Sequence, residues 1–147
     1  MKVGRKAMGK VCVDEIFGEM TYKHRWYKTE EMEFFGKKWP VTIAAKAYSE
    51  KPITEKQRQS YGQYKKDEQR SQTIITEKLI EYINNLEIAG LFIKQKEELQ
   101  KVVTPRTLLF KQDGTTILLL DCVWDADCGI GIKLYPDFAI GIQDLFL

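Results

Sequence analysis

The residues best suited to chemistry in this chain lie close together near its C-terminal end. Asp121, Asp125 and Asp127 flank Trp124, and three carboxylates at this spacing could hold a divalent cation for a carboxylate- or metal-dependent hydrolase. A calcium loop starting at Asp125 would need a bidentate Glu at its twelfth position, where this chain has Pro136. We therefore favour a tight turn between two strands with solvated aspartates, and we expect neither a metal nor another cofactor.

Imidazole and thiol groups are scarce in this sequence. His24 is the single histidine, which excludes a His-rich zinc site and any acid/base scheme with two imidazoles. A nucleophilic pair of His24 with Cys12, Cys122 or Cys128 remains open, although Cys122 lies in an apolar run typical of a core and Cys128 is expected at the surface. An odd number of irregularly spaced cysteines indicates three reduced thiols, and hence a cytoplasmic protein. We expect no catalytic residues.

Phosphate groups, nucleic acid and lipid are not expected as ligands. The segment Gly4–Lys10 matches a phosphate-binding loop, but Val11 stands where the loop requires Ser or Thr, so we interpret residues 1–10 as a basic terminus. The chain has 23 Lys and Arg against 21 Asp and Glu, and a net charge of +2 is too small to indicate nucleic acid. No apolar stretch reaches the roughly 18 residues of a membrane-spanning helix.

The first and last thirds of the chain show the two-residue period of β-strands. Three strands are predicted between residues 11 and 48, from Val11 with Val13, Met20 with Tyr22, and the run Trp39–Ile43. Four more are predicted after residue 104, with a hairpin turn at Gln112–Gly114: Thr107–Phe110, Thr115–Trp124, Ile130–Tyr135 and Phe138–Leu147.

The middle of the chain is helical by pattern. Thr54 and Gln57 have the spacing of a capping box, in which the hydroxyl and the amide side chain bond each other's backbone. One apolar helix face follows from the spacing of five residues: Ile75, Leu79, Tyr82, Ile83 and Leu86. Whether residues 54–86 form one bent helix or two stays open, and Lys94–Lys101 is predicted to add a helical turn or two.

Strands, then helices, then strands indicate a single α+β domain over residues 1–147, with a mainly antiparallel sheet and the central helices packed on one face. We expect the helix around Ile75–Leu86 to pack on the sheet that contains Thr115–Trp124, with Leu79, Ile83, Leu118 and Leu120 buried. The successive apolar residues Leu118–Leu120 predict a central strand covered on both faces.

Several segments resemble a family of small uncharacterised bacterial proteins, the domain of unknown function DUF6985. The matching residues are mainly glycines, aromatics and turn acids: Phe17-Gly18, Tyr22, Trp26, Phe35-Gly36, Pro40–Ala45, Ile53–Tyr61, Asp121–Asp125, Gly129–Ile132 and Ile140–Asp144. Proteins of this kind are associated with toxin–immunity loci. By analogy, the resemblance implies an immunity-like module whose partner is a toxin domain.

We expect a non-enzymatic protein-binding module rather than an enzyme. In this hypothesis, Asp125 and Asp127, with or without Trp124, present an acidic tip to a basic site on a protein partner. The alternative for Trp124 is that it closes the core, since it follows the apolar run Ile117–Val123.

Overall fold

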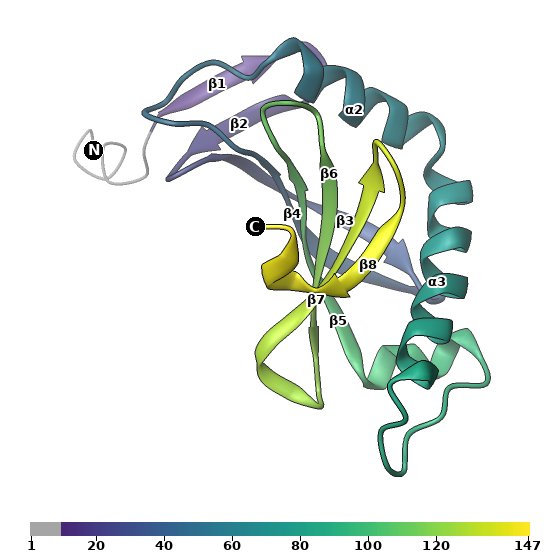
Figure 1. Ribbon diagram of the computed structural model, residues 1–147. Helices are drawn as coiled ribbons and strands as arrows, with labels where there is room; N and C mark the ends of the chain where they lie inside the picture. The colour runs from purple at the N-terminus through teal and green to yellow at the C-terminus, as the bar shows by residue number, and fades with distance from the viewer. Residues whose placement is uncertain (1–9) are drawn as a thin grey trace.

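The structure is a computed structural model that describes residues 10–147, so the loop match at Gly4–Lys10 and most of the predicted basic terminus lie outside the described residues. These described residues form eight strands, two α-helices and two short 3-10 helices (Figure 1). Their bounds are β1 Val11–Asp14, β2 Gly18–Tyr22, β3 Trp26–Phe34, β4 Lys37–Ala45, α2 Glu55–Lys66, α3 Glu68–Asn85, η1 Lys96–Lys101, β5 Val103–Phe110, β6 Thr116–Cys122, β7 Asp125–Tyr135, β8 Ala139–Ile142 and η2 Gln143–Leu145.

All eight strands form one sheet whose order in space is their order in the chain, from β1 to β8. Every neighbouring pair is antiparallel except β4 and β5, which are parallel. Parallel neighbours need a long crossover, and α2, α3 and η1 supply it between β4 and β5 (Figure 1). The predicted α+β class with a mainly antiparallel sheet is therefore confirmed.

The core combines alternate residues of the strands with the buried faces of both helices. Ile75, Leu79 and Ile83 are fully buried and share one apolar cluster with Leu118 and Leu120. The predicted burial of Leu79, Ile83, Leu118 and Leu120 is confirmed. Burying each such side chain contributes about 1.5–3 kcal/mol, so these contacts are a large share of the stability.

The opposite side of β6 is covered less completely than predicted. Ile117 is 1% exposed, but Leu119 is only half-buried. Part of the cover comes from the C-terminal segment. The ring of Phe146 lies so close to Gly131 of β7 that a Cβ there would meet it. The predicted strand Phe138–Leu147 is wrong in its second half, since β8 ends at Ile142 and η2 follows.

The N-terminal part has four strands, one more than predicted. The additional strand is β3, which carries charged side chains on its core-facing side. Lys28 and Glu30 lie at alternate positions with the buried Trp26 and Met32. Their charges break the apolar alternation that marks a strand in the sequence. The two side chains satisfy each other in an ion pair 2.8 Å long, which makes these positions tolerable inside the fold.

The helical middle consists of two helices that meet at Asp67. The predicted capping box is confirmed, with Thr54 Oγ1 accepting from the Gln57 amide and Gln57 Oε1 accepting from the Thr54 amide. Leu86 was predicted on the buried face of the helix, but it caps the end of α3 and is 42% exposed.

Candidate functional site

The acidic segment near residue 125 is part of a β-hairpin, not a long turn. The turn between β6 and β7 consists of Val123 and Trp124 alone, and Asp125 already pairs with Cys122. The next registered pair joins Leu120 to Ile130, so the four residues 126–129 of β7 stand opposite a single residue of β6. The predicted turn is therefore a large β-bulge at the lower end of the molecule (Figure 1).

The bulge is held by its own backbone and by one carboxylate. Asp125 Oδ1 accepts hydrogen bonds from the amides of Asp127, at 3.2 Å, and Cys128, at 3.1 Å. Gly129 then brings the chain back against β6, where a Cβ would overlap the carbonyl oxygen of Leu120. A polar side chain and a residue without Cβ thus fix a loop that would otherwise have few internal bonds.

The tip of the hairpin exposes the two predicted acids but a different apolar residue from the one predicted. Asp125 and Asp127 are exposed, as expected. Trp124 is half-buried and packs against the core, whereas Val123, predicted to end a buried run, is 67% exposed. The two-residue turn explains this exchange, because it points one side chain inward and leaves its neighbour in solvent. The apolar group at the tip is therefore Val123.

The three aspartates do not form the cluster that was the alternative to a turn with solvated aspartates. Asp121 makes an exposed ion pair with Arg106 of β5, with 2.6 Å between its Oδ2 and Nε, while Asp125 bonds its own bulge. Among residues 10–147, no three His, Cys, Asp or Glu side chains come together so as to hold a metal ion. The Asp121/Asp125/Asp127 site proposed for a hydrolase is thus wrong as an arrangement, because each carboxylate has a separate partner or faces solvent.

Apolar side chains are also exposed elsewhere at this end of the molecule. Leu86, at the end of α3, and Phe92, in the loop that follows, are 42% and 64% exposed. The loop and the hairpin turn both lie at the bottom of Figure 1. The hairpin is tied to η1, since the Val123 amide donates to the carbonyl of Val102. This end therefore combines exposed apolar groups with the two exposed acids of the bulge.

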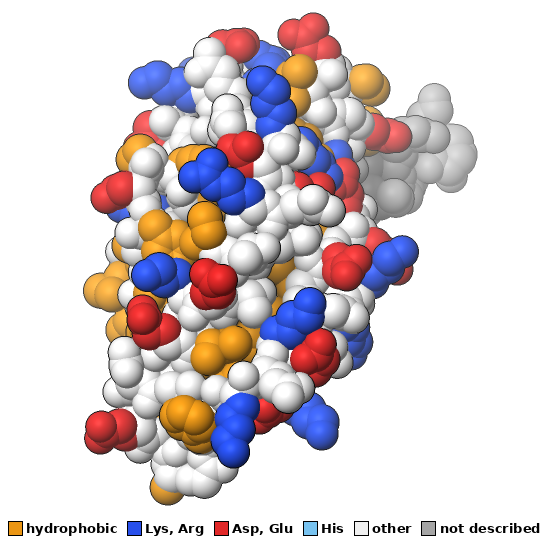
Figure 2. All heavy atoms as spheres, turned by 90° about the vertical axis from the view of Figure 1, so that its right-hand side faces the viewer, with side chains coloured by type: hydrophobic (Ala, Val, Ile, Leu, Met, Phe, Trp, Pro, Cys, Tyr) orange, Lys and Arg blue, Asp and Glu red, His pale blue; other side chains and the backbone are white. Residues whose placement is uncertain are grey.

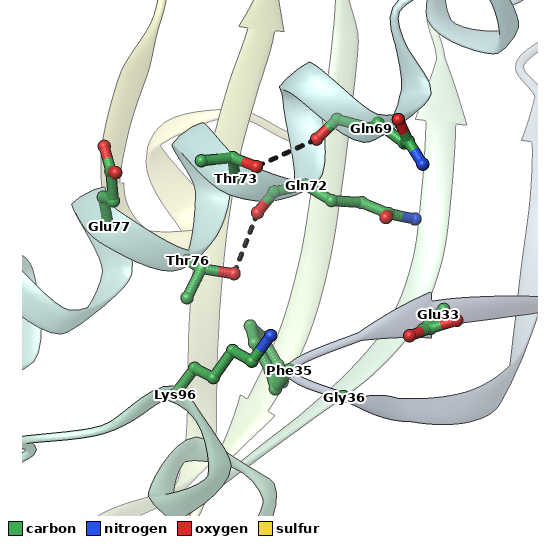
Figure 3. Close-up of a pocket in the computed structure, with 9 residues that line it drawn as sticks. All are labelled: Glu33, Phe35, Gly36, Gln69, Gln72, Thr73, Thr76, Glu77 and Lys96. Carbon is green, nitrogen blue, oxygen red and sulfur yellow. Dashed lines mark hydrogen bonds between the residues drawn. The ribbon is translucent and has the colours of Figure 1, made fainter.

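A groove of about 460 Å³ lies between α3, the β3–β4 turn and η1 (Figure 3). Gln72 and Lys96 reach into it, whereas the hydroxyls of Thr73 and Thr76 bond back to carbonyls of their own helix. Its walls offer amide, carboxylate and ammonium groups. Sequence reasoning missed this groove, because its residues come from three elements and form no motif.

Charged side chains of both signs are interspersed on the face shown in Figure 2, the right-hand side of Figure 1, where α2 and α3 lie. No helix among the described residues has the length and apolar character to span a bilayer.

A half-buried charge cluster under α2 was also missed in the sequence. Glu30 accepts from Lys65 at 3.1 Å and from the Tyr61 hydroxyl at 3.1 Å, besides its ion pair with Lys28. Burial would raise the pKa of Glu30, but the hydrogen bonds from Lys28 and Lys65 lower it below its usual value. Burial, together with Glu30, raises the pKa of Tyr61. The charges are mutually satisfied, so the cluster fixes α2 to β3 and offers no free acid or base.

The single histidine stands apart from the thiols in the fold. His24 is exposed in the β2–β3 turn, beside Lys23 and Arg25. It has no hydrogen bond to a thiol among the described residues, while Cys122 and Cys128 lie on the β6–β7 hairpin and bond carbonyl oxygens there. The geometry therefore gives no support to a Cys–His nucleophile.

Comparison with known proteins gives a family but no described activity. Searches among curated proteins and solved structures find no match. A family model described as a domain of unknown function, DUF6985, matches residues 16–146. The match begins just after β1 and continues into the last residues of the C-terminal segment, so it covers the described strands from β2 to β8 together with α2 and α3. The chain belongs to the DUF6985 family.

Proposed function

We propose that the protein is a binding module that docks on a basic surface of a protein partner through the β6–β7 hairpin. The observation that carries this proposal is the bulge, which holds two exposed carboxylates on a fixed backbone beside the exposed side chain of Val123. A loop that is already ordered loses little entropy on binding, so its contacts contribute more to affinity.

The surface has the composition of a small interface. Asp125 and Asp127 would pair with Lys or Arg of the partner, and Val123 would be buried against an apolar neighbour. Leu86, at the end of α3, and Phe92, in the loop that follows, are also exposed, and this loop lies at the same end of the molecule as the hairpin (Figure 1). The association of similar proteins with toxin–immunity loci suggests, by analogy, a toxin domain as a partner of this kind, in a cytoplasmic setting.

The test removes the charges and keeps the fold. In Asp125→Asn, the side-chain oxygen can still accept from the amides of Asp127 and Cys128, so the bulge stays closed. The double variant Asp125→Asn/Asp127→Asn is used as bait in a native lysate beside the wild type, and captured proteins are identified by mass spectrometry and then purified for titration. The matched control, Glu19→Gln/Glu31→Gln, removes two exposed charges from β2 and β3, which are separated from the hairpin by β4 and β5 in the strand order.

We expect the hairpin variant to weaken binding of the purified partner by on the order of 10-fold, mainly at low salt, because exposed charges act on association through long-range attraction. The control should bind like the wild type, and both variants should unfold at nearly the wild-type temperature. Equal binding by all three proteins would show that the hairpin is a structural feature and that any binding face lies elsewhere.

A further inference from the structure

Two of the three thiols meet at the bulge. Cys122 ends β6 and is buried, and its Sγ lies 3.7 Å from the carbonyl oxygen of Asp125 and 3.6 Å from that of Cys128. Cys128 lies inside the bulge and is half-buried, and its own Sγ contacts only the carbonyl of Gly129, at 3.7 Å. The sulfur of Cys122 thus contacts the backbone of the residue that carries the second thiol.

The electrostatics of the neighbourhood agree with this geometry. Burial is the main cause that raises the pKa of Cys122, and charge on Cys128 adds to it. Tyr82 of α3 is affected in the same way, because burial raises its pKa and both thiols contribute. Each thiol therefore lies within the field of the other, and both face Tyr82. The third thiol, Cys12, is on β1 and pairs with Met20 of β2.

We propose that Cys122 and Cys128 are an oxidisable pair that a peroxide converts into a disulfide across the bulge. In the first step, the Cys128 thiolate attacks one oxygen of the peroxide, the O–O bond breaks, and the departing oxygen leaves as hydroxide and takes up a proton. In the second step, the Cys122 thiol loses its proton and its sulfur attacks the Cys128 sulfenic acid, which releases water. One peroxide is reduced, and two thiols are oxidised.

The roles of the two thiols follow from their exposure. Cys128 is the more exposed of the pair, so it meets the oxidant first, while Cys122 is 8% exposed and can react only with a sulfur that is delivered to it. The bulge makes that delivery possible. Its four residues face a single residue of β6. To turn toward Cys122, the Cys128 side chain gives up its weak contact with the Gly129 carbonyl.

The test uses hydrogen peroxide on the full chain under native conditions, followed by intact mass and peptide mapping. The variants are Cys128→Ser, which removes the attacking thiol, and Cys12→Ser, the matched control that removes the thiol outside the bulge. We expect the wild type and Cys12→Ser to lose the mass of two hydrogen atoms, to yield a linked Cys122–Cys128 peptide, and to recover on reduction. The rate should not depend on protein concentration, since the step is intramolecular.

Several results would overturn the proposal. These are accumulation of sulfinic acid on Cys128 in place of the bridge, covalent dimers whose yield rises with protein concentration, or a loss of two hydrogens that persists in Cys128→Ser. Mapping on the wild-type chain decides the outcome even where a variant folds poorly. The readout is mass alone, so it is independent of whether the hairpin binds a protein.

Discussion

Gln57 is the residue at which the structure makes its sharpest stability prediction. Its side chain is fully buried at the start of α2, where its Oε1 accepts from the Thr54 amide at 2.8 Å. Its Nε2 donates to the carbonyls of Lys46, at 2.8 Å, and Phe110, at 3.0 Å. The Lys46 carbonyl directly follows β4, and the Phe110 carbonyl ends β5. One side-chain amide therefore joins α2 to both strands of the parallel pair.

The substitution Gln57→Glu should destabilise the protein, although Glu is favoured at this position of a capping box. The carboxylate can still accept from Thr54, but its second oxygen would face two carbonyl oxygens. The Phe110 carbonyl keeps a bond from the Lys46 amide at 2.9 Å, whereas the Lys46 carbonyl loses the Gln57 donor. Losing two bonds and leaving a buried acceptor unpaired costs about 2–4 kcal/mol, and the buried charge adds to this.

The loss of unfolding free energy in Gln57→Glu should depend on pH. Burial beside two carbonyl oxygens raises the pKa of the introduced Glu above its unfolded value of about 4.3. A group with a raised folded pKa contributes its stability below the unfolded pKa and loses it as pH rises through the folded pKa. The deficit of Gln57→Glu relative to the wild type should therefore shrink as pH falls from the folded pKa toward about 4.3, where the protonated acid can donate to one carbonyl, and level off at lower pH.

Urea unfolding followed by tryptophan fluorescence measures this difference, since Trp26 and Trp39 are buried. The matched control is Glu98→Gln in the second capping box, at η1, where Glu98 is half-buried and only its Oε2 is bonded, to the Lys94 and Gln95 amides. We expect that control to change stability by less than about 0.5 kcal/mol. A Gln57→Glu protein within about 0.5 kcal/mol of the wild type at neutral pH, or an unchanged deficit in acid, would refute the reasoning.

Three further substitutions test other parts of the fold. Leu79→Ala, at a fully buried site of α3, should cost about 2–5 kcal/mol, and Leu119→Ala, at a half-buried site of β6, clearly less; equal urea midpoints would contradict the incomplete burial of Leu119. Gly131→Ala places a Cβ 2.5 Å from the Phe146 ring and should cost about 1–3 kcal/mol, a penalty that Phe146→Ala should relieve in a double-mutant cycle. Burial would raise the pKa of Asp14, but bonds from the Phe17 and Ile16 amides and from Arg58 lower it, so its stability is lost as pH falls through the folded pKa. Asp14→Asn should flatten the acid limb of the unfolding curve, and an unchanged limb would show that another carboxylate dominates it.

Local patterns predicted those elements whose cause is local. The capping box at Thr54 and Gln57 needs only residues three apart, and the burial of Ile75, Leu79 and Ile83 follows from the helical period. The sequence does not show that the Gln57 amide also bonds the ends of β4 and β5. Those partners lie 11 and 53 residues away in the chain, and no local pattern specifies such a separation.

The predictions failed where charged residues have a role other than the solvent exposure or turn formation that they usually indicate. Lys28 and Glu30 are of residue types that usually face solvent, yet they lie on the core-facing side of β3, because each finds an opposite charge there and Lys65 joins them from α2. The acids around residue 125 read as turn residues, and Asp125 does bond its own backbone. What the composition could not show is the register of β6 and β7, which turns that local motif into a bulge.

The bulge separates the requirements of the fold from those of a binding surface. Residues that face the core, such as Cys122 and Ile130, fix the position of the hairpin, and Gly129 is restricted by the Leu120 carbonyl behind it. Val123, Asp127 and the intervening Ala126 are exposed and carry no part of the core. Their side chains can therefore change with little effect on stability, while the backbone that presents them stays fixed. This combination of a rigid frame with unconstrained side chains is what a recognition loop requires.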